Sequence, residues 1–232
     1  MLEHRFKADL GGGDYGWLNA RHHFTVTADG NRAHRPLGAL VVWNDDLIAP
    51  DSGFPLHGHE NMEIVSYVLE GAVTHRDSAG GQGRTEAGDV QVMSAGTGIR
   101  HEERNAEDVP LRLFQIWLRP RESGGLPRWG SRPFPKADRA GQWAVLASGM
   151  PDDQDALLIR ADARVLGATL KAGQRLNYSM AGQGYLVPTL GAVKVNQVRV
   201  DAGDGLAITL EPQLVVEAID DTEVILVEVF GA

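Results

Sequence analysis

The stretch SGFPLHGHENMEIVSYVLEGAV, residues 52–73, determines how the fold is interpreted. Shifted by 120 positions, it overlays AGQRLNYSMAGQGYLVPTLGAV, residues 172–193. Each stretch carries a pair of glycines 18 positions apart, namely Gly53 with Gly71 and Gly173 with Gly191. A later Gly-Asp turn at residues 88–89 matches residues 203–204 with a shift of 115, so the second copy has lost about five loop residues. The two halves of the chain therefore look like copies of one structure.

The apolar residues of both halves come in short runs that are typical of β-strands. In the first half these runs are GALVVWNDDLIAP, EIVSYVLEG, GDVQVMSAG and LRLFQIWL; in the second half they are ARVLGATL, GAVKVNQVRV, GLAITL and TEVILVEVF. Gly, Pro or Asp turns bound the runs, and few helix signals separate them. Many short strands with frequent turns predict an all-β barrel or sandwich in each half.

The length of 232 residues allows one large domain or two small ones. Residues 119–142, RPRESGGLPRWGSRPFPKADRAGQ, hold four prolines and four glycines and show no periodicity. Such a segment reads as a linker, with room for a short helical turn. We therefore expect an N-terminal barrel over residues 1–118, a linker over 119–142 and a C-terminal barrel over 143–232.

The composition excludes several classes of function. The formal net charge is −9, which argues against non-specific binding to nucleic acid or to anionic membranes. The absence of cysteine excludes disulfides, thiol nucleophiles, Fe–S clusters and cysteine-type zinc sites, so a metal would need His, Asp or Glu. No apolar run reaches the length of a membrane span, and the N-terminus shows no secretory signal, so we expect a cytoplasmic protein.

Two histidines one residue apart, His57 and His59, stand at the head of an apolar run. In the second copy they fall on Asn177 and Ser179, so the fold itself does not require them. An isolated His-x-His pair is commonly surface or turn chemistry. Its loss from the second copy favours a functional interpretation.

A second pair of this kind, His101 and Glu103, lies in GTGIRHEERN, residues 96–105. Alternate residues of a strand share a face, so each pair can point one way. If the strand continues past His59, Glu63 shares that face too, and alternation alone does not choose between the carboxylates. Three imidazoles and one carboxylate suit Fe, Mn, Ni, Cu or Zn better than Ca or Mg.

The remaining histidines receive a structural interpretation. His22 and His23 are expected at a strand edge or an interface, whereas His4, His34 and His75 have no partner at ligand spacing. The tryptophans in or beside apolar runs are expected in the core; these are Trp43, Trp117 and Trp143.

NDDLIAPDSGFPLHGHENMEIVSYVLEG, together with MSAGTGIRHEERN and LRLFQIWL, closely resembles the pirin family of bicupins, particularly its bacterial quercetinase-like members. The match covers the first domain almost continuously and the second more loosely, through LLIRADARVLGATLKAGQRLNY. The resemblance implies two tandem cupin barrels, each a double-stranded β-helix or jelly roll. It also implies a single metal centre in the N-terminal barrel and a C-terminal barrel without metal ligands.

The same resemblance implies a ligand set of His57, His59, His101 and Glu103. In the general cupin pattern the carboxylate comes from the first motif, which here is Glu63. With Glu103 as the ligand, Glu63 is left as a partner of the site or a proton acceptor near the substrate. The metal is a divalent transition ion, with Fe(II) favoured and Mn, Ni, Co, Cu or Zn also possible.

The implied activity is that of a metal-dependent dioxygenase of the quercetin 2,3-dioxygenase type, acting on a flavonol-like aromatic substrate with O2. Glu63 or Glu103 would take the proton of the metal-bound hydroxyl, and Phe54 and Met62 would line the substrate pocket. One alternative is a metal- or redox-responsive regulatory protein with a protein partner and no direct contact with nucleic acid, as the family's eukaryotic co-regulators suggest. Another is a barrel with purely structural zinc.

Overall fold

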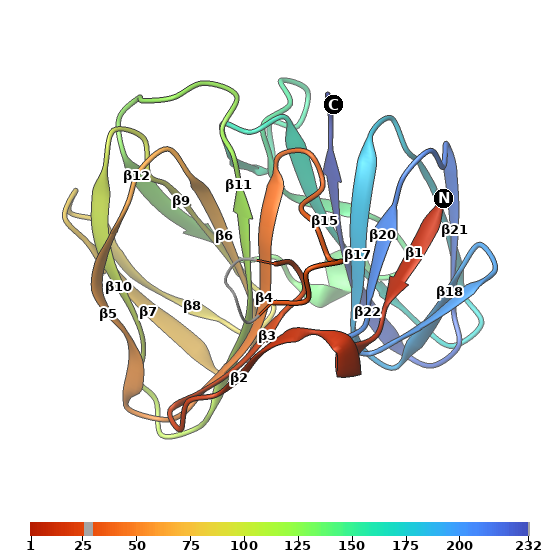
Figure 1. Ribbon diagram of the computed structural model, residues 1–232, viewed down its shortest axis with the longest axis horizontal. Helices are drawn as coiled ribbons and strands as arrows, with labels where there is room; N and C mark the ends of the chain where they lie inside the picture. The colour runs from red at the N-terminus through yellow and green to blue at the C-terminus, as the bar shows by residue number, and fades with distance from the viewer. Residues whose placement is uncertain (26–29, 232) are drawn as a thin grey trace.

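A computed structural model of the protein describes residues 1–25 and 30–231. Residues 26–29 and residue 232, the last of the expected C-terminal barrel, lie outside these ranges. The described chain forms two β-barrels side by side, and each barrel has an inner sheet facing the other barrel and an outer sheet facing away (Figure 1). None of the helices in the described ranges has the length and hydrophobicity that crossing a bilayer requires.

The N-terminal barrel encloses its interior between two antiparallel sheets. Its inner sheet has the strand order β12 (Arg128–Arg132), β9 (Val90–Ser94), β6 (Glu63–Glu70), β11 (Leu111–Leu118), β4 (Leu40–Ile48), β3 (Leu18–His22) and β2 (Gly11–Asp14). Its outer sheet has the order β5 (Ser52–His59), β10 (Ile99–Asn105), β7 (Ala72–Asp77) and β8 (Gln82–Glu86).

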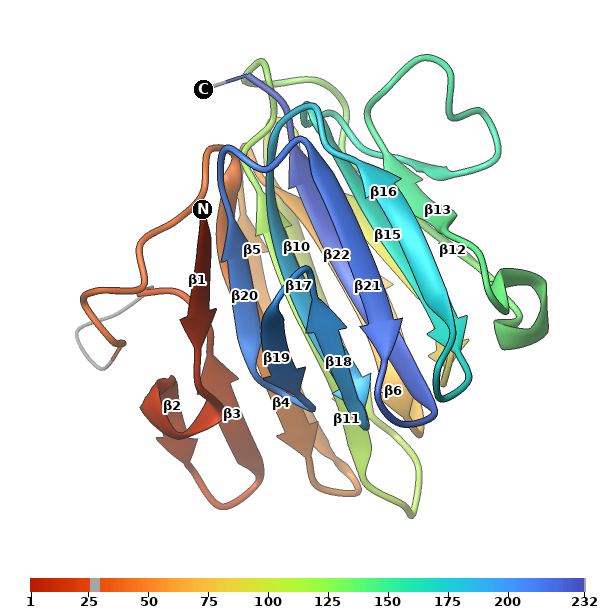
Figure 2. The same ribbon diagram turned by 90° about the vertical axis from the view of Figure 1, so that its right-hand side faces the viewer.

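The C-terminal barrel repeats this arrangement. Its inner sheet has the order β1 (Leu2–Arg5), β20 (Gly205–Ile208), β17 (Gln183–Leu190), β22 (Thr222–Val229), β15 (Ala163–Leu170), β13 (Ala144–Ser148) and β14 (Leu157–Leu158). The outer sheet, which faces the viewer in Figure 2, has the order β16 (Arg175–Ser179), β21 (Gln213–Ala218), β18 (Ala192–Val195) and β19 (Val198–Asp201). The central order β9–β6–β11–β4 recurs as β20–β17–β22–β15, which confirms the predicted duplicated all-β fold.

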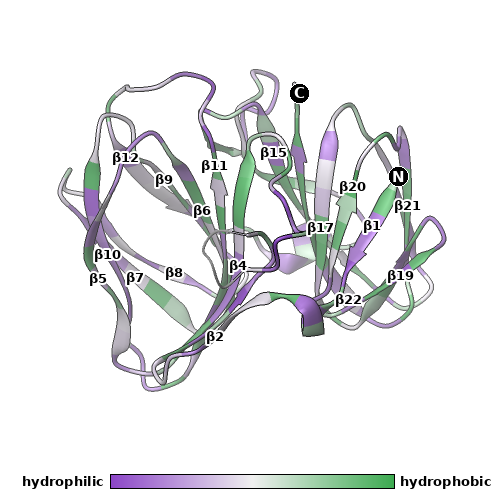
Figure 3. Cartoon of the chain, in the orientation of Figure 1, coloured by the Kyte–Doolittle hydropathy of each residue, from purple (hydrophilic) through white to green (hydrophobic). Residues whose placement is uncertain are grey.

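The two inner sheets pack face to face and form a core that both barrels share. Strand β6 shows how the sequence builds it, because alternate residues point to opposite faces. Val65 and Tyr67 point into the shared core, whereas Ile64 and Val68 belong to small clusters inside the N-terminal barrel. Figure 3 shows hydrophobic positions along strands of both barrels, interspersed with hydrophilic ones.

Polar contacts also join the barrels across this core. His23, expected at a strand edge or an interface, is fully buried, and its Nδ1 lies 3.0 Å from the hydroxyl of Tyr185 in β17. Arg139, at the end of the 3-10 helix η2 (Lys136–Arg139), lies within 2.9 Å of the Glu223 carboxylate and donates to the hydroxyl of Tyr67. These contacts fix the two barrels relative to each other.

The domain boundaries differ from the predicted ones in two places. Strand β1 pairs with β20, so the first residues of the chain belong to the C-terminal inner sheet, where β1 lies among the late strands in Figure 1. A second 3-10 helix, η1 (Lys7–Asp9), then leads into the N-terminal barrel. Strand β12, inside the expected linker, pairs with β9 of the N-terminal barrel. Both β1 and β12 are short strands that pair through backbone groups at the edge of a sheet. Local composition does not reveal which sheet such a strand joins.

The interior of the C-terminal barrel is apolar where that of the N-terminal barrel is polar. In the register of the outer sheets, the pair His75–Glu103 corresponds to the pair Val195–Val216. Both valines are fully buried in a hydrophobic cluster that fills this barrel. Among the residues described, the groups able to hold a metal ion lie in the N-terminal barrel.

Candidate metal centre

Three of the predicted ligands, His57, His59 and His101, meet in the outer sheet of the N-terminal barrel. Antiparallel pairing of β5 with β10 places His101 directly opposite His57. The ring centroids are 4.4 Å apart for His57 and His101, 4.8 Å for His57 and His59, and 5.0 Å for His59 and His101. One ring nitrogen from each residue lies within 4.8 Å of the other two.

Hydrogen bonds determine which ring nitrogens are available. His57 Nδ1 lies 2.7 Å from the carbonyl oxygen of Pro55 and donates to it, which leaves the Nε2 lone pair free. The Nε2 atom of His101 lies 3.1 Å from that of His57. His59 Nε2 is buried and has no hydrogen-bond partner among the described residues.

This arrangement fits a transition-metal ion. Two nitrogens bound cis to one ion at about 2.1 Å are about 3.0 Å apart, close to the separation of the His57 and His101 atoms. Burial, reinforced by the neighbouring His57, lowers the pKa of His59 to about 4 and that of His101 to about 2. Both rings are therefore neutral near pH 7, and their lone pairs can bind a cation.

Glu103 lies in the barrel interior behind His101. The pairing of β5 with β10 is irregular at this point, but β10 pairs regularly with β7, so His101 and Glu103 point to the same, buried face of the sheet. Its Oε1 accepts from Gln91 and its Oε2 from Gln115, each at 2.6 Å, and burial raises its pKa to about 7. Glu103 forms a compact group with His101 and His75, which also offers metal-binding atoms.

Glu63 points away from the interior of the N-terminal barrel, on the face of the inner sheet that packs against the C-terminal barrel. The expectation that it shares a face with the histidines is therefore wrong. Its Oε2 accepts from the Ser94 hydroxyl at 2.7 Å and from the backbone N–H of Arg160 at 3.0 Å. The strand is interrupted between His59 and Glu63, where Asn61 has a left-handed backbone (φ 49°). The interruption resets the alternation, so Glu63 contacts the C-terminal half and not the histidine cluster.

The two residues expected to line the substrate pocket differ in their positions. Phe54 is half-buried, its ring centroid is 6.4 Å from that of His57, and it packs edge-on against Trp17. Met62 packs against the small core cluster of Ile64, Met93, Ala95 and Ile99. Trp117, expected in the core, packs against His59 with 4.9 Å between ring centroids and donates to Gln115, so it also supports the site.

His75 is the residue of this site that the sequence analysis missed. His75 has no partner at ligand spacing along the chain, but its Nδ1 lies 3.5 Å from Nδ1 of His101 across the β7–β10 pairing. Its Nε2 lies 2.9 Å from Oδ2 of Asp77. The signal was the local His-x-Asp alternation at residues 75–77, on a strand that neighbours the His-x-Glu strand.

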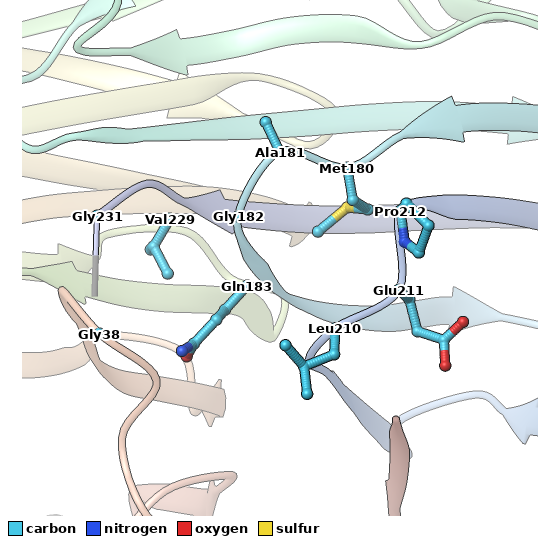
Figure 4. A pocket seen from close by; sticks show the side chains of 10 residues that line it. All are labelled: Gly38, Met180, Ala181, Gly182, Gln183, Leu210, Glu211, Pro212, Val229 and Gly231. Carbon is cyan, nitrogen blue, oxygen red and sulfur yellow. The ribbon is translucent and has the colours of Figure 1, made fainter.

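An open cavity of about 400 Å³ lies beside the cluster. It is lined by Gly58, His59, Glu60, Ser78, Gly98, Ile99 and Arg100. Another cavity, of about 460 Å³, lies at the C-terminal barrel, where Figure 4 shows Gln183, Leu210 and Val229 around it. None of the predicted site residues lines this second cavity, and its acid, Glu211, is paired with the N-terminal amine. The cavity beside His59 is therefore the one that reaches the metal-binding atoms.

Fold and site together define a two-barrel cupin with a histidine-rich metal centre in its first barrel, and comparison with known proteins gives the family. Residues 3–118 match the family model described as Pirin, and residues 145–229 match the model of the quercetinase C-terminal cupin domain. The chain belongs to the pirin family, as the sequence resemblance indicated.

Relatives and solved structures agree with this assignment. A pirin-like protein of Caulobacter vibrioides is 54% identical over 98% of this chain and 99% of its own length. Quercetin 2,3-dioxygenase of Escherichia coli is 37% identical over 97% of each chain. The structure of the bacterial pirin YhhW from Escherichia coli in complex with nickel(II) superposes with a TM-score of 0.92 at 33% identity, over the full length of both chains. The residue cluster and this complex together support a divalent metal.

Proposed function

We propose that this protein is a metal-dependent dioxygenase of the quercetin 2,3-dioxygenase type, with a small flavonol-like substrate and O2 as its reactants. The observation that carries the proposal is the convergence of three imidazoles on one point beside an open cavity. The relative of that name in Escherichia coli and the nickel complex of a related pirin support it. The C-terminal barrel, with valines at the corresponding interior positions, would serve as a partner without metal ligands.

His57, His59 and His101 would hold the metal through their Nε2 atoms, and Glu103 would complete the set from the interior. Fe(II) is the favoured ion, with Mn, Ni, Co, Cu or Zn as alternatives, because imidazole and carboxylate ligands do not separate these ions. When bound, such an ion lowers the pKa of a coordinated hydroxyl group and polarises the substrate.

Glu103 is the candidate proton acceptor. A general base works best when its pKa lies near the working pH, and in the metal-free protein burial raises the pKa of Glu103 to about 7. Gln91 and Gln115 each donate to one of its oxygens and hold the carboxylate in a fixed orientation. Phe54, whose ring centroid is 6.4 Å from that of His57, would contact an aromatic substrate at the edge of the site.

The test is anaerobic reconstitution of the metal-free protein with Fe(II), Mn(II), Ni(II), Co(II) or Cu(II), followed by measurement of quercetin turnover and oxygen uptake. We expect turnover with at least one ion and its loss in His101→Ala. The absence of turnover with every ion, in protein shown to bind them, would overturn the proposed activity and leave the metal centre intact.

A further inference from the structure

Behind the three-histidine cluster lies a buried His–Asp pair. His75 and Asp77 alternate along β7, and their side chains are 1% and 0% exposed. His75 Nε2 lies 2.9 Å from Asp77 Oδ2, and His75 Nδ1 lies 3.5 Å from His101 Nδ1. The pair therefore contacts the ring nitrogen of His101 that faces away from His57.

The hydrogen-bond donors around Asp77 determine where the protons of this chain lie. Asp77 Oδ1 accepts from the backbone N–H groups of Ala79 and Gly81, at 2.8 and 2.9 Å. Its Oδ2 is left to accept from His75, which must then carry its proton on Nε2. The Nδ1 of a neutral His75 is consequently an acceptor, and it can accept only if His101 carries its proton on Nδ1. In that tautomer the lone pair of His101 is on Nε2, the atom that faces His57.

The surrounding hairpin is shaped to hold this pair. Trp129 of β12 stacks on the His75 ring with 4.9 Å between centroids and 7° between planes. A Cβ atom on Gly83 would lie 2.3 Å from the Trp129 ring, and a Cβ on Gly81 would lie 2.3 Å from Asp77 Oδ2. Both positions therefore need glycine for Trp129 and Asp77 to occupy these places. Strand β12, which lies within the expected linker, thus holds the His75 ring in place through Trp129.

We propose that His75 and Asp77 are positioning residues of the metal centre, which hold His101 in the tautomer that presents Nε2 to the ion. The inference rests on the proposed ligation by His101 and deepens it. Groups that orient a metal-bound histidine through its other nitrogen commonly change metal affinity by about 10- to 100-fold when they are removed. His75 and Asp77 are expected to have an effect of this size although neither binds the ion.

The substitution Asp77→Asn tests the proton assignment with almost no change in shape. The amides of Ala79 and Gly81 require an oxygen acceptor, so the asparagine must turn its NH2 group toward His75. His75 Nε2 then becomes an acceptor and its proton moves to Nδ1, where it opposes the proton on His101 Nδ1. His101 is driven into the other tautomer, whose Nε2 carries a proton and cannot bind a metal.

A matched control exists in the same chain. His4 Nε2 lies 2.8 Å from Asp204 Oδ2, and both residues belong to the C-terminal barrel. Asp204→Asn therefore makes the same chemical change in a His–Asp pair far from the metal centre. His75→Phe provides a second test variant, because it keeps a ring against Trp129 and removes both hydrogen bonds. It also assigns the His75 signals in nitrogen-15 NMR spectra.

The experiment has two readouts. Ring nitrogen-15 NMR of the metal-free protein should place the His75 proton on Nε2 in the natural protein and on Nδ1 in Asp77→Asn. The dissociation constant for Ni(II), measured by competition with a chelator, should rise about 10- to 100-fold in Asp77→Asn and His75→Phe and stay unchanged in Asp204→Asn. Thermal unfolding establishes that each variant is folded.

A His75 proton on Nδ1 in the natural protein overturns the proposal, and this measurement needs no variant to fold. Unchanged Ni(II) affinity in folded Asp77→Asn or His75→Phe overturns it as well. Failure of the proposed function is a separate result. The natural protein could bind Ni(II), with lower affinity in both variants, while no ion supports quercetin turnover. That result would overturn the proposed activity and support the positioning role of His75 and Asp77.

Discussion

The Nε2 atoms of His57 and His101 lie 3.1 Å apart, although the residues are 44 positions apart in the chain. The pairing of β5 with β10 sets these two residues opposite each other. Because the N–H at His57 Nδ1 donates to the carbonyl oxygen of Pro55, the lone pair of His57 is on Nε2, which faces His101. Two lone pairs at this separation repel each other unless a cation or a proton lies between them, and a metal ion meets this need.

The first prediction concerns the ligands themselves. His57→Ala and His101→Ala should each abolish stoichiometric metal binding, because each removes one of the converging nitrogens. Elemental analysis after reconstitution with Ni(II) measures the loss. Ni(II) at 100 times its dissociation constant should stabilise the natural protein by about 2.7 kcal/mol, and it should not stabilise either variant.

His4→Ala is the control for a histidine outside the cluster and should retain full occupancy. The C-terminal barrel should remain folded in His57→Ala and His101→Ala, because its apolar interior contains neither of these side chains. Full occupancy in either His57→Ala or His101→Ala would show that the ion binds elsewhere.

A second prediction separates the two carboxylates. Glu103→Gln should weaken metal binding by at least about tenfold, because it removes the negative charge behind His101. Glu63→Gln should leave metal affinity within about twofold, since Glu63 contacts Ser94 and Arg160 on the other face of the sheet. The glutamine keeps an oxygen for both donors, so we expect a stability change of about 1 kcal/mol at most.

Titration of both variants with Ni(II) under one set of conditions measures the difference. A larger loss in Glu63→Gln than in Glu103→Gln would assign the metal-binding carboxylate to the first motif, as in the general cupin pattern.

Much of the fold could be predicted because its signals are local. Alternation and turn glycines mark the strands, and the recurrence of the Gly53–Gly71 spacing at Gly173–Gly191 marks the duplication. Strand β1 could not be predicted as part of the C-terminal sheet, because its partner β20 is about 200 residues away and nothing in its own four residues encodes that pairing.

The site was predictable to the same degree. Alternation along the strands predicted that His57 and His59 share a face, and the family resemblance indicated that His101 joins them. Glu63 was misplaced because Asn61 takes a left-handed backbone, which interrupts the strand and resets its faces. His75 was missed because its contact with His101 is made across strands, and spacing along the chain does not show it.

A third prediction concerns pH and the buried acid Asp46. Burial, reinforced by the charges of Asp45 and Glu103, raises the pKa of Asp46 to about 8 from its ordinary value of 3.8. Between these values the folded protein binds a proton that the unfolded chain releases, so this group makes the protein less stable as the pH rises. The slope approaches about 1.4 kcal/mol per pH unit within that window.

Asp46→Asn removes this slope. The free energy of unfolding of the Asp46→Asn variant, relative to that of the natural protein, should therefore increase from pH 5 to pH 8. Urea unfolding of the metal-free proteins at each pH measures it. A pH-independent difference for Asp46→Asn would mean that Asp46 is already ionised in the folded state at pH 5.

The last prediction concerns the polar contacts between the barrels. Arg139 and Glu223 are 1% and 2% exposed and lie 2.9 Å apart in the shared core. Removing one member of a buried ion pair leaves the other charge without compensation, which costs about 3–5 kcal/mol. Arg139→Met should therefore lower the free energy of unfolding by about this amount, while Arg199→Met, in an exposed pair with Asp201, should leave it nearly unchanged.

Glu223→Leu removes the opposite charge, and the double variant Arg139→Met/Glu223→Leu leaves neither charge buried. Urea unfolding of the natural protein, both single variants and the double variant completes the cycle. We expect the double variant to lose clearly less stability than the sum of the two single losses, because each single loss contains the cost of one uncompensated charge. Additive losses would mean that Lys136, which lies 3.1 Å from the same carboxylate, already compensates Glu223 without Arg139.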